Sequence, residues 1–254
     1  MWRVGSVLLL WVIGGIAAAD GPLRLAANFW PPYTDQRALN GGLASDLVRS
    51  ALHRAGYTTM QSEVPWARVL RGLRIGDYDV AVSAWYSDER REFADFSQAY
   101  LINQVRLVQR RGRSIRFEQL ADLYKYRIAV ARGYAYSPDF DDDDRLSKFV
   151  VQDFAAGARM VQAQRLDLAV EDELVARYLF KGELASISGE LEFLPRSLSE
   201  SGLHILVSHQ HPRHRQIVED FDQAITAMHR DGSYAQIFRK HGYPVQQCGT
   251  RQPC

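Results

Sequence analysis

The sequence is poor in cysteine, in net charge and in long apolar runs, and each shortage excludes a class of protein. Its two cysteines among 254 residues are Cys248 and Cys254, near the end of the chain. They could form one disulfide in an oxidising compartment, but it would close a short loop and add little to the core. A pair with this spacing is a poor zinc motif. We therefore expect neither a disulfide framework nor a cofactor.

The charges are balanced, because 31 Lys and Arg residues face 30 Asp and Glu residues and give a net charge of +1. This balance provides no electrostatic footprint for nucleic acid or an anionic membrane. The GxSxG, HExxH and P-loop patterns that support hydrolysis, zinc chemistry and ATP use are absent as well. With 46% hydrophobic residues, the composition is that of a globular protein with one large domain or two smaller ones.

One long apolar run stands at the N-terminus. A short basic start ends at Arg3, residues 4–16 are apolar, and three alanines at 17–19 precede Asp20. This pattern predicts a cleaved Sec-type signal peptide over residues 1–19 and export to the periplasm. A retained anchor helix is the alternative, but a membrane span needs about 20 apolar residues. No cysteine follows the cleavage site, so we expect no lipid there.

Alternating strand and helix patterns predict an α/β fold with a parallel sheet. Strands are expected at 23–27, 58–64 and 80–83, and helices at 43–55 and 65–73. In such sheets, ligands bind beyond the carboxyl ends of the strands. Asn28, Trp66 and the segment from Ser83 to Arg90 lie at that edge.

A second α/β block begins at Tyr100, which suggests two lobes. Strands are expected at 105–108, 127–131, 149–151, 168–170, 191–194 and 203–207. Helices are expected at 117–124, at 155–164, through Val175 and Leu179, at 212–228, and in a short segment ending at His241.

Arg90 is the principal candidate for a binding residue. The strand at 80–83 leads into the polar corner Ser87-Asp88-Glu89-Arg90 and then into DFSQAYL. This arrangement presents a guanidinium at a strand end, where its planar fork could make two parallel hydrogen bonds to a carboxylate. A surface ion pair is the alternative, and such pairs contribute little to stability.

Aromatic residues are concentrated at the same edge. The loop Phe29-Trp30-Pro31-Pro32-Tyr33 follows the first strand, and Trp66 stands in the first turn of a helix. These residues could line a ligand site. For Trp30, a hydrophobic plug over the core is an equally good interpretation.

Five segments, in this order, resemble a known family: LRLAANFWPPY, GDYDVAVSAWYSDERREFADFS, YRIAVARG, LDLAVEDELVARYL and HRDGSYAQIFRKHG. From about Leu23 to Gly242 the chain resembles the polar amino-acid-binding proteins of ABC importers, the family 3 solute-binding proteins. The resemblance implies a two-lobe periplasmic-binding-protein fold of the hinged type II class, with two crossover strands. Lobe 1 would comprise residues 20–100 and 199–247, lobe 2 residues 101–198, and the tail residues 248–254. Closure of the lobes would trap the ligand between them.

The resemblance also implies roles for two charged residues. Arg90 would bind the α-carboxylate of the ligand, and Asp172, from the other lobe, would bind its α-ammonium. Asp172 could also cap the helix that follows it, and its neighbours Glu171 and Glu173 are alternative acids.

Five further residues match binding positions of the family. Ser83 and Ser87 would lie near the carboxylate, Asn28 would supply a polar contact, and Trp30 and Trp66 would sandwich the ligand side chain. Tryptophan would also attract a positively charged side chain.

The sequence departs from the family pattern in two places. Gly133-Tyr134-Ala135 stands where the family usually carries a hydroxyl residue, so Tyr134 adds bulk to the site. Trp85 and Tyr86 replace small residues before Arg90. We therefore expect a more aromatic and smaller pocket, with ligands different from the usual ones.

Two other clusters could bind metal ions. Residues 141–144 are four consecutive aspartates, but they lack the alternating ligand spacing of a calcium loop, and a solvated loop is the favoured interpretation. His209, His211 and His214 lie in a polar turn around Pro212, which favours a surface loop.

The expected function is that of a monomeric periplasmic binding protein, not an enzyme, that delivers an amino acid or related compound to an ABC permease. A periplasmic sensor with the same fold is one alternative. An enzyme similar to cyclohexadienyl dehydratase is another, with Glu173 as the candidate general acid. Nearby transporter genes would favour the first class, and prephenate turnover would favour the enzyme.

Overall fold

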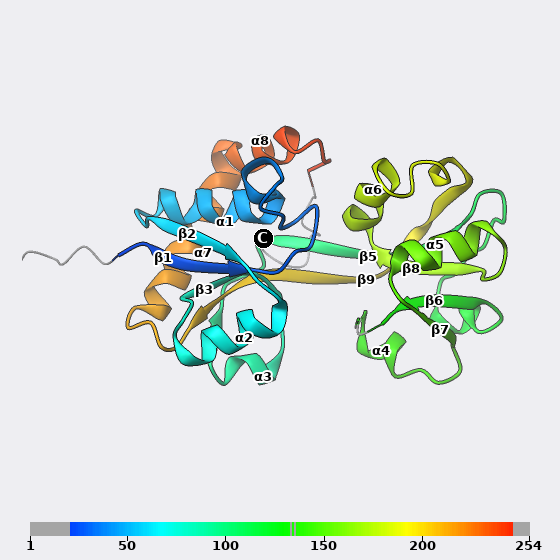
Figure 1. Ribbon diagram of the computed structural model, residues 1–254, viewed down its shortest axis with the longest axis horizontal. Coiled ribbons are helices and arrows are strands. Elements are labelled where there is room, and N and C mark those ends of the chain that lie inside the picture. The colour runs from blue at the N-terminus through cyan, green and yellow to red at the C-terminus, as the bar shows by residue number, and fades with distance from the viewer. Residues whose placement is uncertain (1–20, 133, 135, 246–254) are drawn as a thin grey trace, which may run out of the picture.

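Two long antiparallel strands, β5 (Leu101–Arg110) and β9 (Leu191–Ser208), join the two halves of the molecule in Figure 1. The structure is a computed structural model that describes residues 21–132, 134 and 136–245. Within these residues the strands form one sheet in the order β2-β1-β3-β9-β5-β8-β6-β7, with β4 paired to β9. The predicted signal peptide and both cysteines lie outside the described residues.

The first half is built on three parallel strands, β1 (Leu23–Ala27), β2 (Thr59–Glu63) and β3 (Val80–Trp85). Helices α1 (Leu43–Arg54) and α2 (Trp66–Ile75) connect them, and α3 (Asp88–Arg91) and β4 (Ala94–Phe96) follow. After β9 the chain returns to this half as α7 (His214–Asp231) and α8 (Ser233–Lys240), which pack on α1.

The second half lies between β5 and β9 along the chain. It contains β6 (Arg127–Ala131), α4 (Pro138–Asp141), β7 (Ser147–Val151), α5 (Phe154–Gln162), β8 (Leu168–Asp172) and α6 (Glu173–Lys181). Strand β6 is parallel to both β7 and β8, whereas β8 is antiparallel to β5. Among the described residues, no helix combines the length and the apolar character that crossing a bilayer requires.

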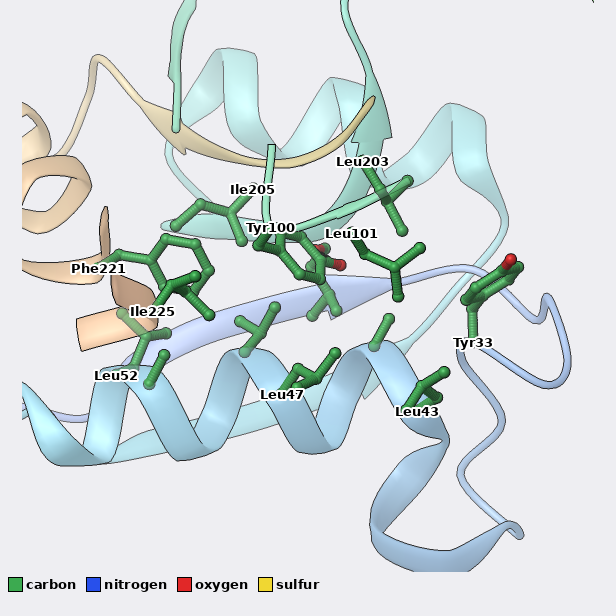
Figure 2. Close-up of a cluster of buried hydrophobic side chains, with 14 of the residues drawn as sticks. Tyr33, Leu43, Leu47, Leu52, Tyr100, Leu101, Leu203, Ile205, Phe221 and Ile225 are labelled. Atoms are coloured by element: carbon green, nitrogen blue, oxygen red, sulfur yellow. Dashed lines mark hydrogen bonds between the residues drawn. The ribbon is translucent and has the colours of Figure 1, made fainter. Parts of the chain in front are cut away.

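Helix α1 forms because its apolar residues recur at helical spacing and face the core of the first half. Figure 2 shows Leu43, Leu47 and Leu52 on one face of α1, pointing toward Tyr100 and Phe221. All five side chains are fully buried. Burying a large apolar side chain contributes about 1.5–3 kcal/mol, so this contact holds α1 against the core of the first half.

Gly42 sets the angle between the aromatic loop and α1. Its φ of 96° lies in the region that side chains rarely adopt, and it precedes the first residue of the helix. A Cβ at this position would come within 2.5 Å of the carbonyl oxygen of Tyr33. The glycine therefore permits the close approach that holds Tyr33 against the start of α1.

The predicted α/β fold is confirmed, but several predicted elements differ in their bounds, and the strand expected at 105–108 extends over Leu101–Arg110. The strands expected at 191–194 and 203–207 are one continuous strand, because the partly exposed residues between them pair with β5. The helix expected at 117–124 is a short 3-10 helix at Leu120–Leu123. The helix expected from 212 begins at His214. The lobe boundaries at 100/101 and 198/199 stay a prediction.

Candidate ligand-binding site

A cavity of about 330 Å³ lies where β1 and β3 end, between the two halves. Most of its lining comes from the first half and β9, whereas Tyr134 follows β6 of the second half. The lining residues are Asn28, Trp30, Trp66, Ser83, Ala84, Trp85, Arg90, Tyr134 and Leu203. The cavity is therefore at the carboxyl edge of the parallel strands, where the sequence predicts a site.

Six of the predicted site residues line this one cavity: Asn28, Trp30, Trp66, Ser83, Arg90 and Tyr134. Trp85, which the sequence indicates as a source of aromatic bulk, lines it as well. Ser87 and Asp172 do not line the cavity. Ser87 is the residue before α3, and its side chain makes no capping hydrogen bond there.

Arg90 lies in the cavity wall with its guanidinium half-buried. Its Nη1 donates a hydrogen bond to the Trp85 carbonyl oxygen at 2.6 Å, and its Cζ lies 5.2 Å from the centre of the Trp66 ring. Burial lowers the pKa of Arg90, and the nearby charge of Glu89 offsets this only in part. Within the described part of the chain, no carboxylate pairs with Arg90, because Glu89 pairs with Arg74 instead. The surface ion pair considered as an alternative is therefore not formed.

Ser83 also lines the cavity, and its hydroxyl lies just behind the cavity surface. Its Oγ is buried and has no hydrogen-bond partner among the described residues. An unpaired buried hydroxyl costs free energy, which a ligand that accepts or donates a hydrogen bond would recover.

Trp30 contributes to both the cavity and the core. It lines the cavity, and it also packs against the core cluster that contains Tyr33, with 4.6 Å between the two ring centres. The indole rings of Trp30 and Trp85 pack edge to face, with 5.8 Å between the ring centres and an angle of 87° between the ring planes. The indole N–H of Trp85 donates to Asn103 Oδ1 at 2.9 Å, which fixes the ring against β5.

Asp172 occupies a different environment from the one the family resemblance implies. Its Oδ1 accepts hydrogen bonds from the N–H groups of Leu174 and Val175, so it caps α6. The same oxygen accepts from Tyr33 Oη at 2.8 Å, and Oδ2 accepts from Asn103 Nδ2 at 3.0 Å. With both oxygens engaged and only 3% of the residue exposed, the carboxylate is not presented to the cavity. The helix-cap alternative is the one that the structure shows.

Tyr33 and Asn103 are the residues around Asp172 that the sequence does not predict. Tyr33 lies 139 positions before Asp172 in the sequence, and it is fully buried at the end of the aromatic loop. Tyr33 ends the aromatic loop and Asn103 belongs to no motif, and no sequence spacing links either residue to Asp172.

A second pocket, of about 260 Å³, shares Trp30 and Tyr134 with the first. Glu171 lines it, 3% exposed, and accepts a hydrogen bond from the Asp172 N–H at 2.8 Å. Burial raises the pKa of Glu171 to about 8, and burial also raises that of Asp172 to about 6. Glu171 is therefore mostly protonated at neutral pH.

Glu173 is held away from both pockets by two arginines. Its Oε2 pairs with Arg106 at 2.7 Å and its Oε1 with Arg177 at 2.6 Å. It lines neither cavity. The structure thus brings Glu171, rather than Glu173, to a pocket.

The acidic run at 141–144 uses its carboxylates for local structure. Asp141 accepts from the N–H groups of Tyr136 and Ser137, and Asp143 pairs with Arg145 at 2.8 Å. In the described residues this run does not gather three carboxylates close enough to hold a metal ion.

The family is shown by a model for bacterial extracellular solute-binding proteins, family 3, which matches residues 25–243. The chain belongs to this family, as the sequence motifs predict, and its fold is that of the periplasmic binding proteins.

Three solved structures illustrate the range of proteins with this fold. A histidine kinase sensor domain with similarity to periplasmic binding proteins has a TM-score of 0.67 at 20% identity, over 86% of this chain and 95% of that one. A mutant of the arginine-binding protein ArgBP from T. maritima has a TM-score of 0.65 at 19% identity, over 87% of this chain and 95% of that one. An ancestral amino acid-binding protein, a precursor of cyclohexadienyl dehydratase, has a TM-score of 0.63 at 19% identity, over 87% of this chain and 95% of that one. At these identities the likeness shows the fold alone.

Proposed function

We propose that this protein captures a small ligand carrying a carboxylate, an amino acid or a related compound, in the cavity around Arg90. The observation that carries the proposal is a half-buried guanidinium, without a carboxylate partner in the described chain, inside an aromatic cavity. A cation in such a place is stabilised by an anion that fits its fork, and a carboxylate fits it with two hydrogen bonds. The unpartnered Ser83 hydroxyl supports a polar ligand in the same cavity.

The cavity favours a compact ligand with an apolar or aromatic body. Its walls include the rings of Trp30, Trp66, Trp85 and Tyr134. Because Tyr134 comes from the second half and the tryptophans from the first, a hinge motion between the halves would enclose the ligand. Asp172 could bind an ammonium group of the ligand, as the family resemblance implies, only if the Tyr33 hydroxyl moved away from its carboxylate.

A ligand screen tests the proposal. The mature protein is melted with each proteinogenic amino acid, with polyamines and with small carboxylates, and the cognate ligand is expected to raise the melting temperature. Arg90→Ala should weaken that ligand by about 10- to 150-fold, because a hydrogen bond to a charged group is worth about 1.5–3 kcal/mol.

Arg71→Ala is the matched control, since Arg71 is exposed on α2 and does not line the cavity. It should bind as the wild type does. A ligand that binds Arg90→Ala as tightly as the wild type would overturn the assignment of the site.

The binding protein is proposed to act in the periplasm as a monomer that passes its ligand to an ABC permease. Membership of an extracellular family supports this role. Measuring uptake of the identified ligand by cells with and without the gene distinguishes the transport role from the sensor role. A transporter component is needed for uptake, whereas a sensor leaves uptake unchanged and alters gene expression.

The enzyme alternative depends on Glu171, which is buried, protonated at neutral pH and next to the cavity. We propose that the protein is not an enzyme, because Arg90 and Glu171 line different pockets. Incubation with prephenate tests this directly. Turnover that is lost in Glu171→Gln would establish the dehydratase-like function instead.

A further inference from the structure

A cluster of two histidines and an aspartate lies in the first half, where β4, the end of β9 and the start of α7 meet. Asp95 lies on β4, His209 directly follows β9, and His214 is the first residue of α7. His209 Nε2 lies 3.2 Å from Asp95 Oδ1, and His214 Nδ1 lies 2.5 Å from Asp95 Oδ2. The donor atoms of the three residues all lie within 4.8 Å of one another.

The backbone holds this arrangement in place. Strand β4 pairs with β9 through Asp95 and Val207, and the His209 N–H donates to the Phe93 carbonyl oxygen at 3.0 Å. Ser208, the last residue of β9, donates through its Oγ to the Leu73 carbonyl oxygen, which ties the end of β9 to α2. Because both histidines stand next to regular elements, their positions depend little on loop motion.

We propose that Asp95, His209 and His214 form a binding site for Zn²⁺ or a similar transition-metal ion. Imidazole nitrogens and a carboxylate oxygen are ligands that zinc prefers, whereas Mg²⁺ and Ca²⁺ prefer sites made of oxygen. Zinc bonds of about 2.0–2.2 Å in a tetrahedron place neighbouring ligand atoms roughly 3.3 Å apart. The contact between His214 and Asp95, at 2.5 Å, needs to widen by about 1 Å, and no other pair of ligand atoms lies more than 4.8 Å apart.

The surroundings of the cluster permit a metal ion to enter. The three side chains are 22–34% exposed, so an ion can reach them and a water molecule can complete the coordination. Asp95 contacts one histidine through each of its carboxylate oxygens, so both histidine rings already lie against the carboxylate. Arg91 is attracted to Asp95, so it is a nearby positive charge that opposes a cation.

The site is separate from the ligand cavity. Strand β9 is antiparallel to β3, so its end at Ser208 lies beside the beginning of β3, whereas the cavity lies at the end of β3. Metal binding and ligand binding can therefore be tested independently.

Titration calorimetry of ZnCl₂ into the full mature chain, without a histidine tag, tests the proposal. We expect the wild type to bind zinc, and His209→Ala and His214→Ala each to weaken this binding at least tenfold, because each removes one of three ligands. Arg91→Gln should bind zinc more tightly than the wild type, because it removes a positive charge near the site. MgCl₂ at the same concentration should give no binding.

His211→Ala is the matched control, because His211 lies in the same turn but outside the cluster. It should bind zinc as the wild type does. Cys248 and Cys254 can also bind zinc, so the difference between these histidine variants decides the outcome. No zinc binding, or equal zinc binding by wild type, His209→Ala and His214→Ala, each with a native circular dichroism spectrum, would overturn the proposal.

Discussion

Glu171 should make the protein less stable as the pH rises, and Glu171→Gln should remove that loss. The folded protein raises the pKa of this carboxyl to about 8, chiefly through burial, from 4.5 in an exposed chain. A group whose pKa is higher in the folded state gives its full stability below the unfolded value and loses it as the pH rises through the folded value. The relevant window therefore runs from about pH 4.5 to pH 8.

The size of the effect follows from the two pKa values. At pH 7 the unfolded carboxyl is ionised and the folded one is mostly not, which disfavours the folded state by on the order of 3 kcal/mol. In a chain of this size, 1 kcal/mol shifts the melting temperature by about 2–4 °C. Gln keeps the shape of the side chain and an oxygen that can accept the Asp172 N–H, but it does not ionise.

Melting curves at a series of pH values measure the effect. The advantage of Glu171→Gln over the wild type should grow by roughly 6–12 °C between pH 4.5 and pH 7. Glu183→Gln is the control, because Glu183 lines the same pocket but its side chain is 54% exposed. Its curve should run parallel to that of the wild type. A constant gap between Glu171→Gln and the wild type would refute the reasoning.

Three further substitutions test the contacts around the site. Tyr33→Phe should lower the free energy of unfolding by about 1.5–3 kcal/mol in urea titrations, because it removes the hydroxyl that donates to the buried Asp172. Gly42→Ala should lower the free energy of unfolding by about 1–3 kcal/mol or more in the same assay. The added Cβ would clash with the Tyr33 carbonyl oxygen, and the φ of this residue is strained for alanine. Trp85→Phe should cost about 1–3 kcal/mol by leaving Asn103 Oδ1 without its indole donor, and a melting temperature equal to that of the wild type would contradict this contact.

Local patterns predict much of the fold because the helices and inner strands carry their own periodicity. Strand β1 lies at 23–27 as predicted, and α1 ends one residue before the predicted position. Local patterns fail for β9, whose polar middle segment pairs with β5 more than 90 residues earlier in the chain. The strand β4 has three residues and is too short to show alternation.

The same distinction applies to the site. Residues that follow a strand or begin a helix, such as Arg90 and Trp66, are found because the edge of a parallel sheet collects them. Asp172 shows the limit of this reasoning. Its position at the end of β8 is correct, but its partners Tyr33 and Asn103 come from distant segments, so no spacing indicates that its oxygens are already engaged.

The path of β9 has a consequence for how the polypeptide acquires its structure during synthesis. The second half forms from one uninterrupted stretch between β5 and β9, whereas the first half needs residues from both ends of the described chain. Strand β3 lacks its β9 neighbour, and α1 lacks α7 and α8, until residues after 203 have been made. Because sequence-distant contacts form slowly, the first half should be the last part to become resistant to proteolysis, although its strands β1 to β3 are made before the second half.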